Sequence, residues 1–179
     1  MGEIAIPRPV KLICGILAAS PSWLDRGRET LAARFGEIDA ASLPVPFSFT
    51  VYYRDEMGEN ILRQFVSFRL LIPAENLANI KLATNAMETP LSEGGKRRVN
   101  LDPGYLDLSK LVLATTKDAT YRVYLGEGIH AQPTLFFRDG SFRPWEWTYP
   151  DYRACSAIEF FNRVRGEYKK GYVMLRKVT

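Results

Sequence analysis

The chain has 179 residues, of which 46% are apolar and 25% are charged, and this is the composition of an ordinary globular domain. It excludes a disordered or collagen-like chain, and no apolar run approaches the roughly 18 residues that a membrane-spanning helix needs. The 24 Lys and Arg residues only slightly outnumber the 20 Asp and Glu residues, so net charge alone indicates no nucleic-acid partner.

The N-terminal elements are predicted to be a buried strand and a helix. Val10–Leu17 is almost entirely apolar and rich in β-branched residues, which is typical of a strand covered on both faces. Ser20 and Pro21 have the pattern of an N-cap and a first helical residue. Apolar residues then recur at helical spacing up to Phe35, and Gly36 predicts the end of the helix.

The middle of the chain predicts two strands and a second helix. Phe47–Tyr53 alternates apolar and polar residues, as a half-buried strand does, and Arg54–Gly58 follows as a polar turn. Phe65–Ile72 predicts the next strand, Pro73–Met87 a helix, and Val99–Leu101 another strand. The resulting order β-α-β-β-α-β favours a ferredoxin-like layer of antiparallel strands with two helices on one face.

The C-terminal part extends this layer. Four further strands are predicted at residues 111–115, 121–125, 129–137 and 142–147, with a hairpin turn at Asp139-Gly140. Ala154–Tyr168 carries one apolar stripe and predicts an amphipathic helix that packs on the sheet. Because no linker or repeat interrupts the chain, residues 1–179 are expected to form a single α+β domain.

Several familiar motifs are absent or incomplete. Gly126–Ala131 matches G-x-G-x-x-A, but the segment that follows is predicted to be a strand, so a hairpin turn is favoured over a dinucleotide site. There is no G-x-x-x-x-G-K-[ST] motif, and Cys14 and Cys155 with one histidine are too few for a zinc site. No leader with a cleavage site is recognised, which predicts a cytoplasmic protein.

Three polar blocks are candidates for a ligand site. In the first block, Asn100 and Asp102 precede a Pro-Gly turn that would aim the carboxylate at a ligand, although an Asx turn has the same pattern. In the second block, Thr116, Lys117 and Asp118 follow a buried strand and offer groups suited to phosphate, although a solvated turn explains them equally.

The third block, Trp145–Arg153, is rich in aromatic residues. Tyr149, Asp151 and Arg153 could wall a pocket for an anion, or Asp151 could cap the last helix. The single histidine, His130, is a further candidate because it shares a strand face with Gln132 and could act as an acid or base near neutral pH. A hydrogen-bonded structural histidine is the alternative.

Four segments together resemble a prokaryotic family catalogued as domain of unknown function four-four-one-six. They are Phe47–Gly58, Val99–Leu106 (with NLDPGYL), Lys110–Asp118 (KLVLATTKD) and Trp147–Arg153 (WTYPDYR). The resemblance implies no activity, cofactor or partner, and it does not separate site residues from turn and cap residues.

The leading hypothesis is a site for a small anionic ligand such as a nucleotide. If the protein is an enzyme, Asp102 or His130 would do acid–base work while Lys117 steadies negative charge, and the cofactor is unknown. No spacing rule supports a metal on Asp102, Asp118 and Glu56. The alternative is a non-catalytic RNA- or protein-binding module that uses the basic segment Arg153–Thr179, with seven cations and two carboxylates.

Overall fold

The computed structural model describes the backbone of residues 2–176 and the side chains of residues 2–171. An antiparallel sheet dominates it, with the order β11-β10-β8-β7-β1-β4-β2, while β3 pairs with β4 and β9 with β10. The strands are β1 (Val10–Ala18), β2 (Ile38–Ala41), β3 (Val45–Pro46), β4 (Leu62–Ile72), β7 (Val99–Leu106), β8 (Lys110–Thr115), β9 (Val123–Gly126), β10 (Ile129–Arg138) and β11 (Ser141–Pro144). A small separate hairpin joins β5 (Ser92–Glu93) to β6 (Lys96–Arg97).

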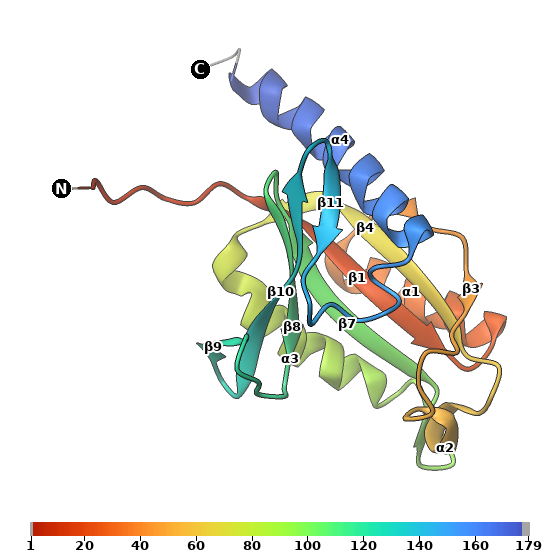
Figure 1. Ribbon diagram of the computed structural model, residues 1–179. Coiled ribbons are helices and arrows are strands. Elements are labelled where there is room, and N and C mark those ends of the chain that lie inside the picture. Colours follow the sequence, from red (N-terminus) through yellow and green to blue (C-terminus); the bar gives the residue numbers. More distant parts are fainter. Residues whose placement is uncertain (1, 177–179) are drawn as a thin grey trace.

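Helices cover both faces of the sheet (Figure 1). They are α1 (Pro21–Phe35), the short α2 (Arg54–Met57), α3 (Leu77–Glu88), which follows a 3-10 turn at Ala74–Asn76, and α4 (Cys155–Arg176). Leu12 and Ile16 of β1 pack in one core with residues of α1 and α3, whereas Ile13 packs in a second core with residues of α4. All nine residues of β1 are therefore buried, as the apolar run predicts.

The predicted α+β class and the C-terminal helix are confirmed. The N-terminal helix begins as expected, because the Ser20 side chain accepts a hydrogen bond from the Trp23 backbone N–H, and Gly36 ends it with a φ of 89°. The hairpin prediction for Gly126–Ala131 is also confirmed: the turn joins β9 to β10, and Glu127 has a positive φ. In the described part of the chain, no helix is long and apolar enough to cross a membrane.

The prediction of a strand at Phe47–Tyr53 is wrong. The strands that pair with β4 in this region are β2 and the two-residue β3, and β3 ends at Pro46 before the segment begins. The alternation of apolar and polar residues has a different cause, because Phe47 is buried beside Ile61 while the residues that follow form an exposed loop with their rings in mutual contact. The predicted polar turn that follows contains α2.

A split in the sheet opens beside the centre of β7. Only its last three residues, Gly104 to Leu106, pair with β8, and the strands diverge from there. Pro103, at the point of divergence, has no N–H with which to continue the ladder. Leu101 would be left unpaired on this edge, but its N–H donates to Glu88 Oε1 at 2.7 Å and its carbonyl accepts from Lys81 Nζ at 2.9 Å. Two α3 side chains thus take the place of the missing strand.

The same geometry corrects the prediction for the first polar block. Pro103 and Gly104 lie inside β7 rather than in a turn, and Asp102 pairs with Gly15 across the β1–β7 ladder. The Asx-turn interpretation is therefore wrong. Gly104 fits this position because an added Cβ would lie only 2.4 Å from the Val112 carbonyl oxygen.

Candidate functional site

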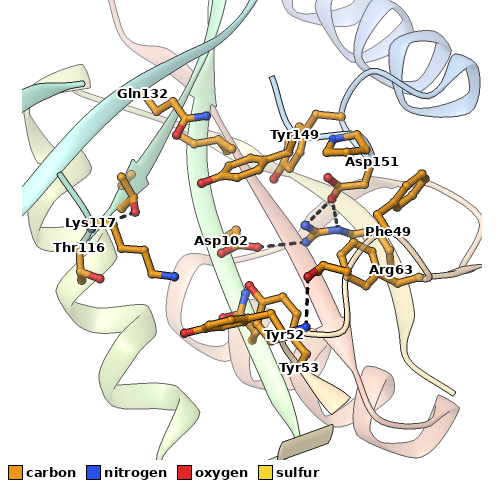
Figure 2. Close-up of a pocket in the computed structure, with 18 of the residues that line it drawn as sticks. Phe49, Tyr52, Tyr53, Arg63, Asp102, Thr116, Lys117, Gln132, Tyr149 and Asp151 are labelled. Atoms are coloured by element: carbon orange, nitrogen blue, oxygen red, sulfur yellow. Dashed lines mark hydrogen bonds and ion pairs between the residues drawn. The ribbon is translucent and has the colours of Figure 1, made fainter. Parts of the chain in front are cut away.

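A cavity of about 550 Å³ occupies the split between β7 and β8. Its walls come from β4, β7, β8, β10 and α3, from the loop that contains residues 47–53, and from residues 149–152 before α4. Figure 2 shows Lys117 and Asp102 extending into it from opposite sides, and Tyr149 and Tyr52 on two further sides. A cavity of this size is typical of a small-molecule site.

The guanidinium of Arg63 is the buried centre of the site. Its Nε and Nη2 lie 2.7 and 2.5 Å from Asp151 Oδ2, and its Nη1 lies 3.1 Å from Asp102 Oδ2. Burial alone would lower the pKa of Arg63, but the charge of Asp151 and the neighbouring groups raise it above its ordinary value. Arg63 therefore stays charged, and it fixes two carboxylates that are 49 positions apart in the chain.

Asp102 presents the exposed part of this cluster to the cavity. Its side chain is 25% exposed, whereas those of Arg63 and Asp151 are only 6% and 5% exposed. Burial would raise the pKa of Asp102, but the positive charges of Arg63 and Lys81 outweigh that effect and lower it below its ordinary value. Asp102 is therefore a carboxylate at neutral pH and can accept hydrogen bonds from a ligand.

A second ion cluster borders the cavity around Arg97. Its guanidinium donates to Glu88 Oε2 and Asn100 Oδ1 through Nη1, at 2.9 and 3.0 Å, and to Glu56 Oε2 through Nη2, at 2.9 Å. Because Glu56 belongs to α2, this contact ties the loop that carries α2 to β6 and α3. Arg97 also orients the side-chain amide of Asn100.

Two lysines on the cavity wall lack a carboxylate partner among the described residues. Lys81 Nζ is buried and donates to the Leu101 carbonyl, and no described carboxylate lies within ion-pair distance of it. Lys117 is exposed, and its Nζ lies 4.4 Å from the ring centroid of Tyr52 rather than beside a carboxylate. The charge of Lys81 acts on Asp102 and Glu88, so Lys117 is the cation on the wall that stands apart from the described carboxylates.

Arg122 arranges three parts of the wall at once. Its Nε donates to Gln132 Oε1 at 2.9 Å, its Nη1 to the Lys117 carbonyl at 2.7 Å, and its Nη2 to the Tyr149 hydroxyl at 2.8 Å. These three acceptors belong to β10, to the turn after β8 and to the loop before α4. Arg122 is therefore a positioning residue for the site.

The loop between β3 and β4 supplies an aromatic wall. Phe47 contacts Phe49 and Tyr53 edge-to-face, with ring centroids 5.7 and 6.1 Å apart, and Tyr53 contacts Tyr52 at 5.0 Å. Phe49 is about half exposed and Tyr52 is more than half exposed, which places both at the rim of the cavity. Lys117 on the opposite rim meets Tyr52 by a cation–π contact (Figure 2).

Three buried polar atoms on the wall have no partner within the protein. They are Asn100 Nδ2, Gln132 Nε2 and the Tyr152 hydroxyl, and each belongs to a side chain that is at least 94% buried. The amide oxygens of Asn100 and Gln132 already accept from Arg97 and Arg122, which leaves each amide nitrogen as the end turned away from the arginine. The amide nitrogen of Asn100 lies near enough to Asp102 to help lower the pKa of that carboxyl. Unpaired buried donors are costly, and a bound ligand is one way to satisfy them.

Six of the nine residues predicted for the site line the cavity, namely Asn100, Asp102, Thr116, Lys117, Tyr149 and Asp151. The other three lie elsewhere. His130 Nε2 is 3.5 Å from Asp118 Oδ1, and Asp118 is 79% exposed. Arg153 is exposed and donates to the carbonyls of Trp145 and Glu146. The helix-cap interpretation of Asp151 is wrong, because α4 begins only at Cys155 and the Asp151 side chain is bound to Arg63.

The described residues offer no metal centre. Within the part of the chain that the structure describes, no three His, Cys, Asp or Glu side chains gather as metal ligands would. Glu56 is paired with Arg97, Asp102 with Arg63, and Asp118 lies near His130. These three carboxylates, the candidate metal ligands of the sequence, therefore belong to three separate contacts.

The sequence interpretation missed the cations that organise the cavity, although each leaves a signal. Arg63 stands at the start of a strand whose next five residues include three apolar ones, and Lys81 follows Leu77 and Ile80 on the buried face of α3. A charged residue in such a pattern is expected to be paired inside the protein. Arg97 and Arg122 lie in turn-rich segments, where a solvated cation has the same pattern.

Comparison with known proteins identifies a family but no characterised relative. No curated protein and no solved structure matches the chain. The family model described as "Domain of unknown function (DUF4416)" matches residues 8–168, which include every residue that lines the cavity. The chain therefore belongs to this family of unknown function, as its sequence blocks suggested.

Proposed function

We propose that the protein binds a small anionic molecule, such as a nucleotide or another phosphate- or carboxylate-bearing compound, in the cavity between β7 and β8. The observation that carries the proposal is Lys117, which reaches a 550 Å³ cavity without a carboxylate partner among the described residues, with the buried Lys81 as a second cation on the wall. Cationic side chains in a partly enclosed site attract and hold an anion more strongly than they do in open solvent.

The same site favours binding over acid–base chemistry. The low pKa of Asp102 makes its carboxylate a weak base, whereas an efficient general base has a pKa near the working pH. His130, the other candidate for acid–base work, does not line the cavity. We therefore assign Asp102 the role of a hydrogen-bond acceptor and Lys117 that of an anion-binding cation at the rim.

A thermal-melt screen at fixed ionic strength tests the proposal. Inorganic phosphate, nucleotides, sugar phosphates and small dicarboxylates are the probes. A probe at about 100 times its Kd adds about 2.7 kcal/mol to the stability of the folded state, which raises the Tm of a chain of this size by about 5–10 °C. Lys117→Ala is expected to abolish the shift without lowering the Tm of the ligand-free protein, because its side chain is exposed.

Lys96→Ala is the matched control, because Lys96 is an exposed lysine on the small β5–β6 hairpin and does not line the cavity. The control should keep the full shift. A panel in which no anion raises the Tm would contradict the proposal. A shift that survives Lys117→Ala, or one that Lys96→Ala abolishes as well, would contradict the assignment of the site.

The alternative of an RNA- or protein-binding module has less support from the residues that would carry it. Arg165 Nε donates to the Leu108 carbonyl and its guanidinium lies 3.3 Å from the ring centroid of Phe137, so it packs within the protein. Lys170 pairs with Glu167. Lys177 lies outside the described residues. This alternative predicts RNA binding whose affinity falls steeply with salt concentration. The dependence of log affinity on log salt concentration should be less steep in a variant with alanine at Arg163, Arg165 and Lys169. The cytoplasmic location stays a prediction.

A further inference from the structure

We infer that the ligand carries a neutral, hydroxyl-bearing group, such as a sugar or polyol, which binds between Asp102 and the unpaired amides of Asn100 and Gln132, while its anionic group binds at Lys117. This inference rests on the proposed function and adds the chemical class and the orientation of the ligand. It follows from the three kinds of polar group that the cavity wall presents.

The carboxylate of Asp102 decides what can lie at the inner end of the cavity. It is ionised and three-quarters buried, and one of its oxygens, Oδ2, is 3.1 Å from Arg63 Nη1. A phosphate or carboxylate placed against it would be repelled, because water screens like charges much less in a partly buried site than in open solvent. The group that contacts Asp102 must donate a hydrogen bond, so the anionic group of the ligand lies elsewhere.

The two amides impose the opposite requirement. Gln132 Nε2 is a buried donor without a partner in the protein, and Asn100 Nδ2 is a buried donor beside Asp102 that makes no hydrogen bond of ordinary length. Arg97 and Arg122 hold the corresponding amide oxygens. A ligand group that contacts them must accept a hydrogen bond. The Tyr152 hydroxyl, also buried and unpaired, can serve as a donor or an acceptor.

A hydroxyl group satisfies both requirements at once, because it donates one hydrogen bond and accepts others. A group with several hydroxyls can give one proton to Asp102 and accept from both amides. The aromatic side chains of Tyr52, Tyr53 and Tyr149 on the wall supply apolar faces for the carbon skeleton between the hydroxyls. Lys117, exposed at the rim, is then left for the anionic group (Figure 2).

The test compares ligands of equal charge that differ in their hydroxyls. Calorimetry measures the affinity for glucose 6-phosphate, ribose 5-phosphate and glycerol 3-phosphate and compares it with the affinity for methyl and butyl phosphate. An acyclic nucleoside phosphonate without hydroxyls is a further control, because its nucleobase carries hydrogen-bonding groups but no hydroxyl. At least one hydroxylated phosphate is expected to bind about tenfold or more tightly than the alkyl phosphates, because a site built for a hydroxyl leaves its polar groups unpaired with an analogue that lacks it.

Two variants test the wall residues without removing the fold. Gln132→Glu keeps an oxygen for Arg122 and replaces the unpaired donor by an acceptor, and Tyr152→Phe removes a hydroxyl that has no partner in the protein. The preference for the hydroxylated phosphate over butyl phosphate is expected to fall about tenfold in Gln132→Glu and several-fold in Tyr152→Phe. Butyl phosphate, measured on each variant, corrects for the added charge.

Each outcome decides between the two proposals. If alkyl phosphates or the phosphonate bind as tightly as every hydroxylated phosphate, the site binds anions and the inference about hydroxyl groups is overturned. If the preference exists but is unchanged in both variants, the assigned orientation is overturned. If none of the compounds binds and the anion screen is also negative, the proposed function fails with it.

Discussion

Arg63 on β4 and Asp151 before α4 are 88 positions apart in the chain, yet Arg63 Nε lies 2.7 Å from Asp151 Oδ2 and both side chains are at least 94% buried. This pair fixes the loop that leads to α4 against the face of the sheet that α4 covers. Because Asp102 is held by the same guanidinium, the pair also sets the position of the carboxylate that faces the cavity.

Removing the guanidinium should destabilise the protein strongly. Arg63→Met leaves the buried carboxylate of Asp151 without its partner, and losing one member of a buried pair costs about 3–5 kcal/mol. Arg69→Met, on the same strand, is the control, because Arg69 and Glu37 form an exposed pair and such pairs contribute about 0–1 kcal/mol. Urea unfolding measures both variants, and equal losses would contradict the assigned importance of burial.

Gly15 makes room for this cluster. A Cβ at this position would lie 2.6 Å from the Tyr152 hydroxyl and 2.8 Å from Arg63 Nη1. Gly15→Ala is expected to destabilise the protein by about 1–3 kcal/mol through overpacking. In a Tyr152→Phe background the nearer atom is absent, so the same substitution should cost less, by about 1 kcal/mol. A double-mutant cycle measures the coupling, and a cost that is equal in both backgrounds would contradict the predicted contact.

Local patterns predicted most of the elements because their signals are themselves local. The apolar run of β1, the Ser20 cap and the Asp139-Gly140 hairpin each follow from a few neighbouring residues. Phe47–Tyr53 misled because alternation of residue types does not itself require burial in a sheet. Phe47 is buried, but Phe49 and Val51 lie on an exposed loop, so the period of two has no strand behind it.

The candidate site could be predicted only in part for a related reason. Polar residues that break an apolar segment, such as Asp102 and Thr116, stand out in the sequence, and they do line the cavity. The partner of Asp102 comes from a distant segment, and only the sheet order, with β7 and β4 on either side of β1, brings Arg63 beside it. No spacing along the chain encodes the split between β7 and β8 that creates the cavity.

The pKa of Asp102 predicts how stability depends on pH. Folding lowers this pKa, so the contribution of Asp102 to stability is complete above the pKa of the unfolded chain, near 4, and is lost as the pH falls through the lower value in the folded protein. Asp102→Asn should therefore lower the free energy of unfolding by about 1–3 kcal/mol at pH 7, which is typical of a hydrogen bond to a charged group. The difference should shrink below pH 4.

Urea unfolding of both proteins at pH 7, 5, 4 and 3 measures this difference directly. The pKa of Glu88 is raised by burial and acts in the opposite direction, but Glu88 is present in both proteins and largely cancels in the comparison. A difference that stays constant down to pH 3, or grows as the pH falls, would contradict the predicted link between Asp102 and Arg63.

Glu88 accepts a hydrogen bond from Leu101 at the open edge of β7, and this contact should contribute to stability. Glu88→Ala leaves the buried N–H of Leu101 without an acceptor and removes a partner of Arg97, whereas Glu88→Gln retains an oxygen for Leu101. An unsatisfied buried donor costs about 1–3 kcal/mol, so the alanine variant should be less stable than the glutamine variant by about that amount. Equal stabilities in chemical denaturation would show that water or a rearranged side chain satisfies Leu101.

Arg122 should control ligand affinity without contacting the ligand. Arg122→Leu frees the Gln132 amide, the turn at Lys117 and the Tyr149 hydroxyl together, because one guanidinium holds all three. We expect a loss of affinity of about tenfold or more, measured by calorimetry well below the Tm so that the folded fraction is unchanged. Arg138→Leu is the control, since Arg138 is an exposed arginine on β10 that does not line the cavity. Unchanged affinity in Arg122→Leu would mean that each of the three groups is held by other contacts.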